Sequence, residues 1–323
     1  MNHWCQSTKE RYFPVEKQNL ITNAEFLNYP ISIGCDPEFF LVDSKTKKPV
    51  SPHEFLSGTK TEPTPVNGGA VQVDGLAVEF NIDPAYNTVG FNRNINSVMS
   101  DIRKMIPSHL EFHFTPTMWF DEDYLAKLPS HVLELGCDPD FDAYTNGAPN
   151  PRPKPLVKDG KVLRTAAGHI HIGWPGDIDV TSEVHRWNCI LLAKRLDMVF
   201  KPTMSLIDFD TLRSSMYGKP GAYRPKPYGM EYRTPSNVWV PSNGLRTTMF
   251  NLTRYALGSL LVCNKFAERS ANDVRNISGF SKNSPYSLAY LFDAPGMGWP
   301  YIDINAISAA NTSAKSKEIA QWR

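Results

Sequence analysis

The sequence lacks the features that mark several large classes of protein. It has only five cysteines, widely spaced and without a Cys-x-x-Cys pair, so no disulfide framework is indicated. The most apolar helical stretch, around residues 256–263, is too short to span a bilayer, and the first residues contain no apolar signal segment. We therefore expect a protein of the reducing cytoplasm that has no membrane partner.

Neither sign of charge is in excess. The 323 residues include 34 Lys and Arg against 33 Asp and Glu, and a net charge of +1 argues against a broad nucleic-acid-binding surface. Hydrophobic residues make up 41% and charged residues 21%, which excludes a disordered, collagen-like or coiled-coil chain.

Three common catalytic motifs are also absent. The sequence has no Gly-x-Gly-x-x-Gly, no Walker phosphate loop and no Gly-x-Ser-x-Gly. A dinucleotide fingerprint, a P-loop and a hydrolase nucleophile elbow are therefore not supported.

Short strand-like runs alternate irregularly with long loops, and three stretches have helical spacing of apolar residues. The expected helices are 92–105, 181–200 and 247–268, and the expected strands are 31–35, 39–42, 71–73, 76–82, 109–114, 169–174 and 230–233. The 26 prolines cluster in 49–65, 149–155 and 220–241, which predicts long loops. This pattern favours an α+β fold with an antiparallel sheet over a doubly wound one.

Acidic residues occupy unusual places in two of the expected strands. Asp36 and Glu38 flank Pro37 between two strand-like runs, and on an extended chain they share one face. Glu79 lies in mid-strand after the hairpin signal Asp74-Gly75, where acids are rare. These acids could hold a cation. Two alternatives remain open: Asp36 could cap a surface turn, and Glu79 could lie on a solvated outer face of the sheet.

Histidines and basic residues follow later in the chain. In the run Gly-His-Ile-His-Ile-Gly, His169 and His171 share one face of a strand. Glu231 and Arg233 share one face of a later strand. Basic residues that suit phosphate oxygens are concentrated near them: Arg213, Lys219, Arg224, Lys226 and Arg233. Two alternatives remain open: the histidines could be hydrogen-bonded residues of a half-buried sheet, and Glu231 and Arg233 could form an ion pair at the surface. Carboxylates with an imidazole suit Mg²⁺ or Mn²⁺, and nearby arginines indicate a polyphosphate such as ATP.

In this order the motifs resemble the glutamine synthetase and glutamate–cysteine ligase superfamily. The segments that carry the likeness are 36–38, 79–81, 168–173 and 229–236. Segments 136–144 and 217–224 narrow it to the carboxylate–amine ligase family encoded by some tailed bacteriophages, and the resemblance runs from about residue 31 to about residue 241.

The resemblance implies a curved antiparallel sheet with helices packed on its convex face and with ATP and two or three divalent cations on the concave face. It implies that ATP phosphorylates a carboxylate to an acyl phosphate, from which an amine displaces phosphate to form an amide. The expected cofactors are ATP and Mg²⁺ or Mn²⁺, and the expected location is the cytoplasm, that of a host cell if a phage encodes the protein.

Residue roles follow from the matching positions. The expected metal ligands are Asp36, Glu38, Glu79, His169 and Glu231. Synthetases usually have a glutamate at the position of Asp36. The expected phosphate-binding residues are His171, Arg224 and Arg233 from the resemblance, with Arg213 and Lys219 from the concentration of charge. Arg224, Arg233 and Glu79 are the predicted catalytic residues: the arginines would stabilise the charge that develops on the transferred group, and Glu79 resembles a metal ligand.

The expected organisation is an N-terminal extension over 1–28, a catalytic domain over 29–270 and a C-terminal segment over 271–323 that packs on or extends that domain. The chain is shorter than a typical glutamine synthetase, whose separate N-terminal domain and ammonia-site loop are not recognisable here. The substrate pair therefore stays open among small molecules, peptides and modified bases, and a homo-oligomer is possible.

Three other functions compete with the ligase. A phosphotransferase could use the same sheet, because one fold hosts several chemistries. A metal-dependent hydrolase could hold Zn²⁺ with His169 and His171. A non-catalytic nucleotide-binding or structural protein is the third alternative.

Overall fold

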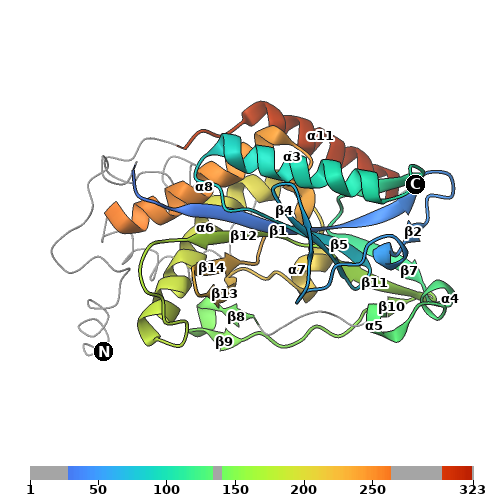
Figure 1. Ribbon diagram of the computed structural model, residues 1–323, viewed down its shortest axis with the longest axis horizontal. Helices are drawn as coiled ribbons and strands as arrows, with labels where there is room; N and C mark the ends of the chain where they lie inside the picture. Colours follow the sequence, from blue (N-terminus) through green and yellow to red (C-terminus); the bar gives the residue numbers. More distant parts are fainter. Residues whose placement is uncertain (1–27, 134–139, 263–299, 322–323) are drawn as a thin grey trace.

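A long strand at the centre of a large antiparallel sheet organises the molecule (Figure 1). The computed structural model describes residues 28–133, 140–262 and 300–321. The sheet order is β3-β4-β5-β1-β12-β14-β13-β8-β9, with β2 and β6 pairing to the far end of β1. Its strands are β1 (Ser32–Asp43), β2 (Pro49–Val50), β3 (Thr64–Val66), β4 (Gly69–Asp74), β5 (Ala77–Ile82), β6 (Leu110–His113), β8 (Phe141–Asp142), β9 (Ala148–Pro149), β12 (Gly168–Gly173), β13 (Ala222–Lys226) and β14 (Gly229–Tyr232).

A second, three-stranded sheet lies at one end of the molecule, on the right in Figure 1. It contains β7 (Thr117–Asp121), β10 (Val157–Lys158) and β11 (Lys161–Thr165). The helices are α3 (Thr88–Met105), α4 (Glu122–Leu125), α5 (Ser130–Leu133), α6 (Glu183–Ile207), α7 (Thr211–Met216), α8 (Asn243–Val262) and α11 (Ile304–Gln321), with short 3-10 turns η1 (Pro52–Glu54), η2 (Ala143–Thr145) and η3 (Asn237–Trp239). Helices and antiparallel strands in these proportions make the α+β fold that the sequence predicts.

One strand replaces two expected ones. The sequence predicts a break at Asp36-Pro37-Glu38, whereas β1 runs through it without interruption. β1 pairs with β12 up to Pro37, with β5 at Glu38 and Phe39, and with β6 from Phe40 onward, so the proline lies where the strand changes partner. A proline has no N–H to donate, and this position tolerates that loss. The surface turn capped by Asp36 is therefore wrong.

The expected hairpin is confirmed. β4 and β5 pair from Gly69 with Ile82 to Asp74 with Ala77, and Gly75 closes the turn with a φ of 57°. A positive φ favours glycine, which is why the Asp-Gly pair signals this turn.

The three long helices lie near their expected places but begin differently. α3 starts four residues earlier than expected because the Asn87 side chain caps it, accepting a hydrogen bond from the Gly90 N–H at 2.8 Å. Ser182 caps α6, which continues past residue 200 and through Pro202. α8 begins at Asn243, and the expected residues 263–268 lie outside the described residues.

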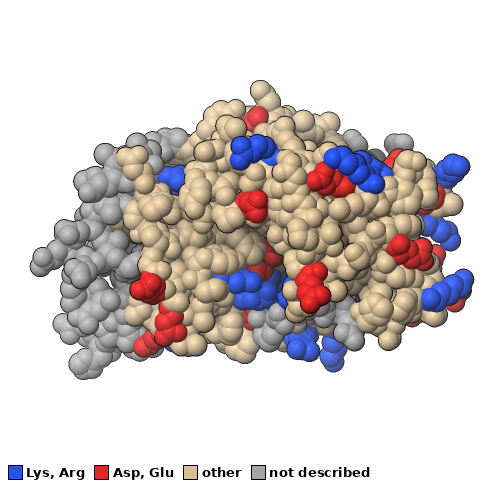
Figure 2. Space-filling view, viewed as in Figure 1, with Lys and Arg blue, Asp and Glu red and all other residues tan. Residues whose placement is uncertain are grey.

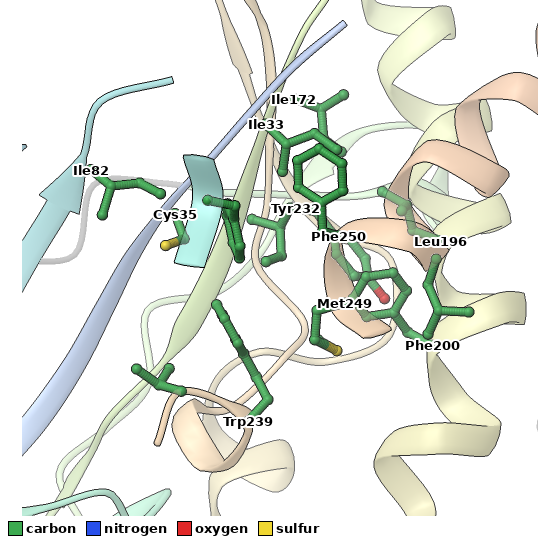
Figure 3. Packing of buried hydrophobic residues seen from close by; sticks show 14 of the residues in the cluster. Ile33, Cys35, Ile82, Ile172, Leu196, Phe200, Tyr232, Trp239, Met249 and Phe250 are labelled. Atoms are coloured by element: carbon green, nitrogen blue, oxygen red, sulfur yellow. The ribbon is translucent and has the colours of Figure 1, made fainter. Parts of the chain in front are cut away.

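Apolar side chains on one face of the sheet form the core with α3, α6 and α8 (Figure 3). The labelled residues of this layer are Ile33, Cys35, Ile82, Ile172 and Tyr232 from the strands, Leu196, Phe200, Met249 and Phe250 from the helices, and Trp239 from η3. Phe39 is fully buried against the rings of Phe80, Phe112 and Phe114. Ile307 of α11 joins the same core, so the described part of segment 271–323 packs on these helices.

Two further expectations concern cysteines and membranes. Cys35 and Cys189 are the cysteines within the described residues, and both are buried free thiols. None of the described helices is long and apolar enough to cross a membrane.

We predict that Phe39→Ala lowers the free energy of unfolding by about 3–5 kcal/mol, because it leaves a cavity among three aromatic rings. Urea denaturation measures the change. Val89→Ala is the control: Val89 is 74% exposed on α3, and its loss should cost less than about 0.5 kcal/mol. Equal effects of the two substitutions would contradict this description of the core.

Candidate functional site

The face of the sheet opposite the helices carries the charged residues singled out in the sequence. Side chains alternate between the two faces of a strand, so the apolar residues of β1, β5, β12 and β14 turn to the core and their neighbours turn the other way. Five adjacent strands, β5-β1-β12-β14-β13, contribute the polar face. Its ionisable members are Glu79, Asp36, Glu38, His169, His171, Glu231, Arg224 and Lys226.

This face forms one wall of a cavity of about 560 Å³. The lining includes Asp36, Glu38, Glu79, His169 and His171 together with basic residues and two tyrosines. Figure 2 shows a hollow near the centre of this side of the molecule, with acidic and basic side chains next to each other in it. The volume is in the range of pockets that bind cofactors and small molecules.

Three side chains in the cavity have the spacing of metal ligands. One potential ligand atom each from Asp36, His169 and Glu231 lies within 4.8 Å of the other two. His169 Nδ1 is 3.2 Å from Asp36 Oδ1 and 3.5 Å from Glu231 Oε1. His171 Nε2 lies 3.0 Å from the other Asp36 oxygen. The alternation of β12 thus places both histidines against one carboxylate of β1, its neighbour in the sheet.

Basic residues surround the second of these carboxylates. Glu231 is fully buried, and its Oε2 lies 3.2 Å from Arg224 Nη1 and 2.9 Å from Lys226 Nζ. Its Oε1 contacts Arg233 Nη1. The side of the cavity at β13 and β14 therefore carries more positive than negative charge.

The carboxylate of Asp140 pairs with Arg233 on this basic side. Asp140 was not among the expected site residues. Its Oδ2 lies 3.3 Å from Arg233 Nε, and both side chains are less than 10% exposed. The sequence offers a signal for it: Asp140 ends the Gly-Cys-Asp-Pro-Asp segment at 136–140, which resembles Gly-Cys-Asp-Pro-Glu at 34–38. Residues 134–139 lie outside the described residues.

The opposite side, at β1 and β5, is acidic. Glu38 and Glu79 are direct partners across the two strands. Glu38 accepts a hydrogen bond from the Ala167 N–H at 3.0 Å, and Glu79 accepts one from the Gln72 amide at 2.6 Å. Among the described residues, neither carboxylate forms an ion pair with a basic side chain.

The pKa values follow this distribution of charge. Burial, together with the nearby charge of Asp74, raises the pKa of Glu38 to about 8. Burial and the carboxylates of Asp36, Asp74 and Glu38 raise the pKa of Glu79 well above its usual value. Burial opposes the ionisation of Asp36 as well, but His171 and His169 hold its pKa well below the usual range.

The two histidines differ in protonation. Burial and the charge of Arg233 lower the pKa of His169 to about 4, so its ring is neutral at pH 7 and can donate a lone pair. Burial alone would lower the pKa of His171, but the Asp36 carboxylate outweighs it and the pKa is raised. Tyrosines contact both rings: the Tyr217 hydroxyl lies 3.4 Å from His169 Nε2, and the Tyr228 hydroxyl contacts His171 Nδ1.

These residues fit a divalent cation. Asp36 Oδ1 and His169 Nδ1 are buried 3.2 Å apart, and both are within 4.8 Å of a Glu231 oxygen. Carboxylate oxygens and one imidazole are ligands for Mg²⁺ or Mn²⁺.

Two expected phosphate-binding residues do not line the cavity. Arg213, on α7, is buried and donates hydrogen bonds to the backbone carbonyls of Thr234 at 2.8 Å and Pro235 at 2.9 Å. Lys219 is exposed in the following loop. In this structure Arg213 supports the chain that follows β14, whereas Arg224 and Arg233 do line the cavity.

Comparisons with known proteins give little further information. No protein-family model and no curated protein matches this sequence. Among solved structures the chain is similar to a bifunctional glutathione synthetase from Pasteurella multocida, with a TM-score of 0.41 and 11% sequence identity. The similarity covers 90% of this chain and 48% of that one, so the chain spans about half the length of the solved structure.

We predict that the metal-free protein loses stability as the pH rises. The pKa of Glu38 is about 8 in the folded protein and about 4.5 in the unfolded chain, so the folded state binds the proton more tightly. Its contribution is fully present below pH 4.5 and is lost as the pH rises through 8. The loss should reach a few kcal/mol, since a tenfold change in proton affinity corresponds to about 1.4 kcal/mol.

Thermal unfolding of the protein in EDTA from pH 5 to pH 9 measures this loss. Glu38→Gln should flatten the profile, whereas Glu111→Gln, at an exposed residue paired with Lys47, should leave it unchanged. Parallel profiles for the wild type and Glu38→Gln would contradict the assignment.

We also predict that Asp140→Asn destabilises the protein by about 3 kcal/mol, because it removes a carboxylate from a buried ion pair with Arg233. Asp121→Asn is the matched control, since Asp121 pairs with Lys48 and Lys161 at the surface, where such pairs contribute less than about 1 kcal/mol. Urea denaturation compares the two, and a larger loss in Asp121→Asn would refute the ranking.

Proposed function

We propose that this protein is an ATP-dependent carboxylate–amine ligase, which phosphorylates a carboxylate to an acyl phosphate and joins it to an amine as an amide. The observation that carries the proposal is the division of one cavity into an acidic half and a basic half on adjacent strands. Membership of the phage-encoded carboxylate–amine ligase family, with its glutamine synthetase-like sheet and a location in the host cytoplasm, belongs to the same proposal.

The acidic half is suited to holding divalent cations. Asp36, Glu38 and Glu79 would be the ligands there, with His169 and Glu231 at the border to the basic half. Bound Mg²⁺ or Mn²⁺ supplies neutralisation of phosphate charge and a fixed orientation for the transferred group. Such a cation would lower the raised pKa values of Glu38 and Glu79, because an opposite charge nearby favours the ionised carboxylate.

The basic half is suited to phosphate oxygens. Arg224 and Lys226 line the cavity from β13, and Arg233 lines it beside them. Phosphoryl transfer depends on positioning and charge stabilisation rather than on a covalent enzyme group. Fixed guanidinium groups serve this need without reorganisation during the reaction, because Glu231 and Asp140 already hold them in place.

An acyl phosphate must also be protected from water. Tyr217 and Tyr228 line the cavity, and the Tyr217 ring lies 5.3 Å from the Arg233 guanidinium carbon. These rings cover the histidines and reduce the access of water to the buried end of the basic half.

We predict acceptor-dependent release of ADP and phosphate when the protein is given ATP, Mg²⁺ and a mixture of amino acids, polyamines and peptides. Mass spectrometry of the products should show an amide. Glu79→Gln should lose at least about a hundredfold in rate, since it removes one metal-binding charge without emptying space. Glu111→Gln, at the exposed residue of strand β6, should keep the wild-type rate.

Other results would point to the competing functions. A stable phosphorylated product would indicate a phosphotransferase, and turnover with Zn²⁺ but without ATP would indicate a hydrolase. Thermal unfolding tests whether the protein binds nucleotide at all. If it does, ATP at about a hundred times its Kd should raise the free energy of unfolding by roughly 2.7 kcal/mol. No such increase with Mg²⁺ present would favour a non-catalytic protein. Wild-type turnover in Glu79→Gln would reject the proposed site.

A further inference from the structure

A proline-rich strap over residues 150–156 joins the two sheets. It leaves the large sheet after β9 and enters the small sheet at β10, and it runs along the lower edge of the molecule (Figure 1). Its sequence is Asn-Pro-Arg-Pro-Lys-Pro-Leu, which continues an alternation of prolines that begins at Pro149. No helix, strand or turn interrupts the strap.

The strap is anchored at its ends and holds its course between them without backbone hydrogen bonds. The Asn150 N–H donates to the Asp140 carbonyl at 2.8 Å, and the Leu156 carbonyl accepts from the Leu163 N–H at 2.9 Å. Among the described residues, 151–155 form no backbone hydrogen bond. Each proline fixes its own φ and keeps the residue before it out of the helical region. The strap is therefore a stiff, extended segment of the polyproline II kind.

One edge of the strap faces the protein and the other edges face solvent. A polyproline II helix has three residues per turn, so residues three apart share an edge. Asn150 and Pro153 are half-buried, and Pro153 lines the cavity. Arg152 and Lys154 are exposed. The strap therefore forms part of the rim of the cavity and turns its basic residues outward.

These two basic residues have no partner within the protein. In the described part of the chain, no carboxylate oxygen lies within 4 Å of Arg152 or Lys154, and neither side chain forms a hydrogen bond. The stretch 148–158 contains no Asp or Glu. In the cavity lining, by contrast, basic and acidic side chains are nearly equal in number. The strap thus adds uncompensated positive charge at the rim.

Charges in such a place act on a ligand before it binds. The field of an exposed charge extends over about 10 Å at 0.1 M salt and about 30 Å at 0.01 M. Positive charge at the entrance of a cleft raises the association rate of anionic ligands, and a change at the rim alters that rate and its salt dependence. Because the strap is stiff, its charges stay at a constant distance from the entrance.

We propose that the strap is an electrostatic guide that attracts polyphosphate ligands to the cavity. Arg152 and Lys154 speed the approach of the ligand and make no contact with it once it is bound. Polyphosphates are the ligand class, because steering grows with the charge of the ligand and the inner wall at β13 and β14 carries basic side chains for phosphate oxygens. This inference rests on the proposed function for the nucleotide as the ligand.

Stopped-flow kinetics with a fluorescent, non-hydrolysable ATP analogue and Mg²⁺ tests the guide. We expect the double variant Arg152→Gln/Lys154→Gln to lower the association rate constant at least about threefold at low salt and to change the dissociation rate constant less than about twofold. At high salt the variant should match the wild type, because exposed charges are then screened. Arg152→Glu/Lys154→Glu should be slower still at low salt, since the effect follows charge.

Two further variants separate steering from other effects. Arg152→Lys should keep the wild-type association rate, because it keeps the charge and loses only the fork of the guanidinium. Arg93→Gln/Lys45→Gln is the matched control, since it removes one arginine and one lysine that are exposed and lie outside the cavity lining. It should associate at the wild-type rate.

The guide is overturned if wild type and Arg152→Gln/Lys154→Gln associate equally fast at low salt. It is also overturned if the variant loses affinity through faster dissociation, which would show a direct contact with the bound ligand. Inorganic tripolyphosphate, followed by the intrinsic fluorescence of the protein, separates this inference from the proposed function. If tripolyphosphate binds at a rate that depends on the strap but the ATP analogue does not bind, the ligase proposal fails and the guide stands. If neither binds, both fail.

Discussion

The crowding of carboxylates on one partly buried face of the sheet is the constraint on which this site depends, and among the described residues Glu38 and Glu79 have no ion-pair partner. Glu38 and Glu79 face each other across β1 and β5, and Asp36 lies two residues from Glu38. Like charges at this distance in a poorly solvated place repel, which the raised pKa values of Glu38 and Glu79 express. The cation of the proposed function would relieve that repulsion, because an opposite charge nearby favours the ionised form of a carboxylate.

The basic half is organised in the opposite way, because its charges are compensated within the chain. Glu231 and Asp140 hold Arg233, and Glu231 also holds Arg224 and Lys226. The helices and the register of the strands keep both halves in place. Ile170 and Ile172 of β12 are buried on the core side while His169 and His171 face the cavity, so a slip of one residue would exchange the two sets.

Much of this face could be predicted from alternation within single strands. His169 with His171, Glu231 with Arg233, and the Asp74-Gly75 hairpin were all readable because neighbours along one strand determine them. The continuous course of β1 through Pro37 was not, since it depends on a change of partner strand. Charge alone also misplaced Arg213, because a sequence does not show whether an arginine turns to a cavity or to backbone carbonyls. The place of Arg164 in the cavity lining, and the contacts of the Tyr217 and Tyr228 side chains with the histidines, depend on the tertiary fold.

Anomalous diffraction from crystals grown with Mn²⁺ and a non-hydrolysable ATP analogue tests the central claim most directly. The account predicts at least one manganese peak bound by oxygens of Asp36, Glu38 or Glu79, with the phosphates of the analogue between that metal and Arg224. A protein that binds the analogue with no manganese at these carboxylates, or with its phosphates outside the cavity, would contradict the account.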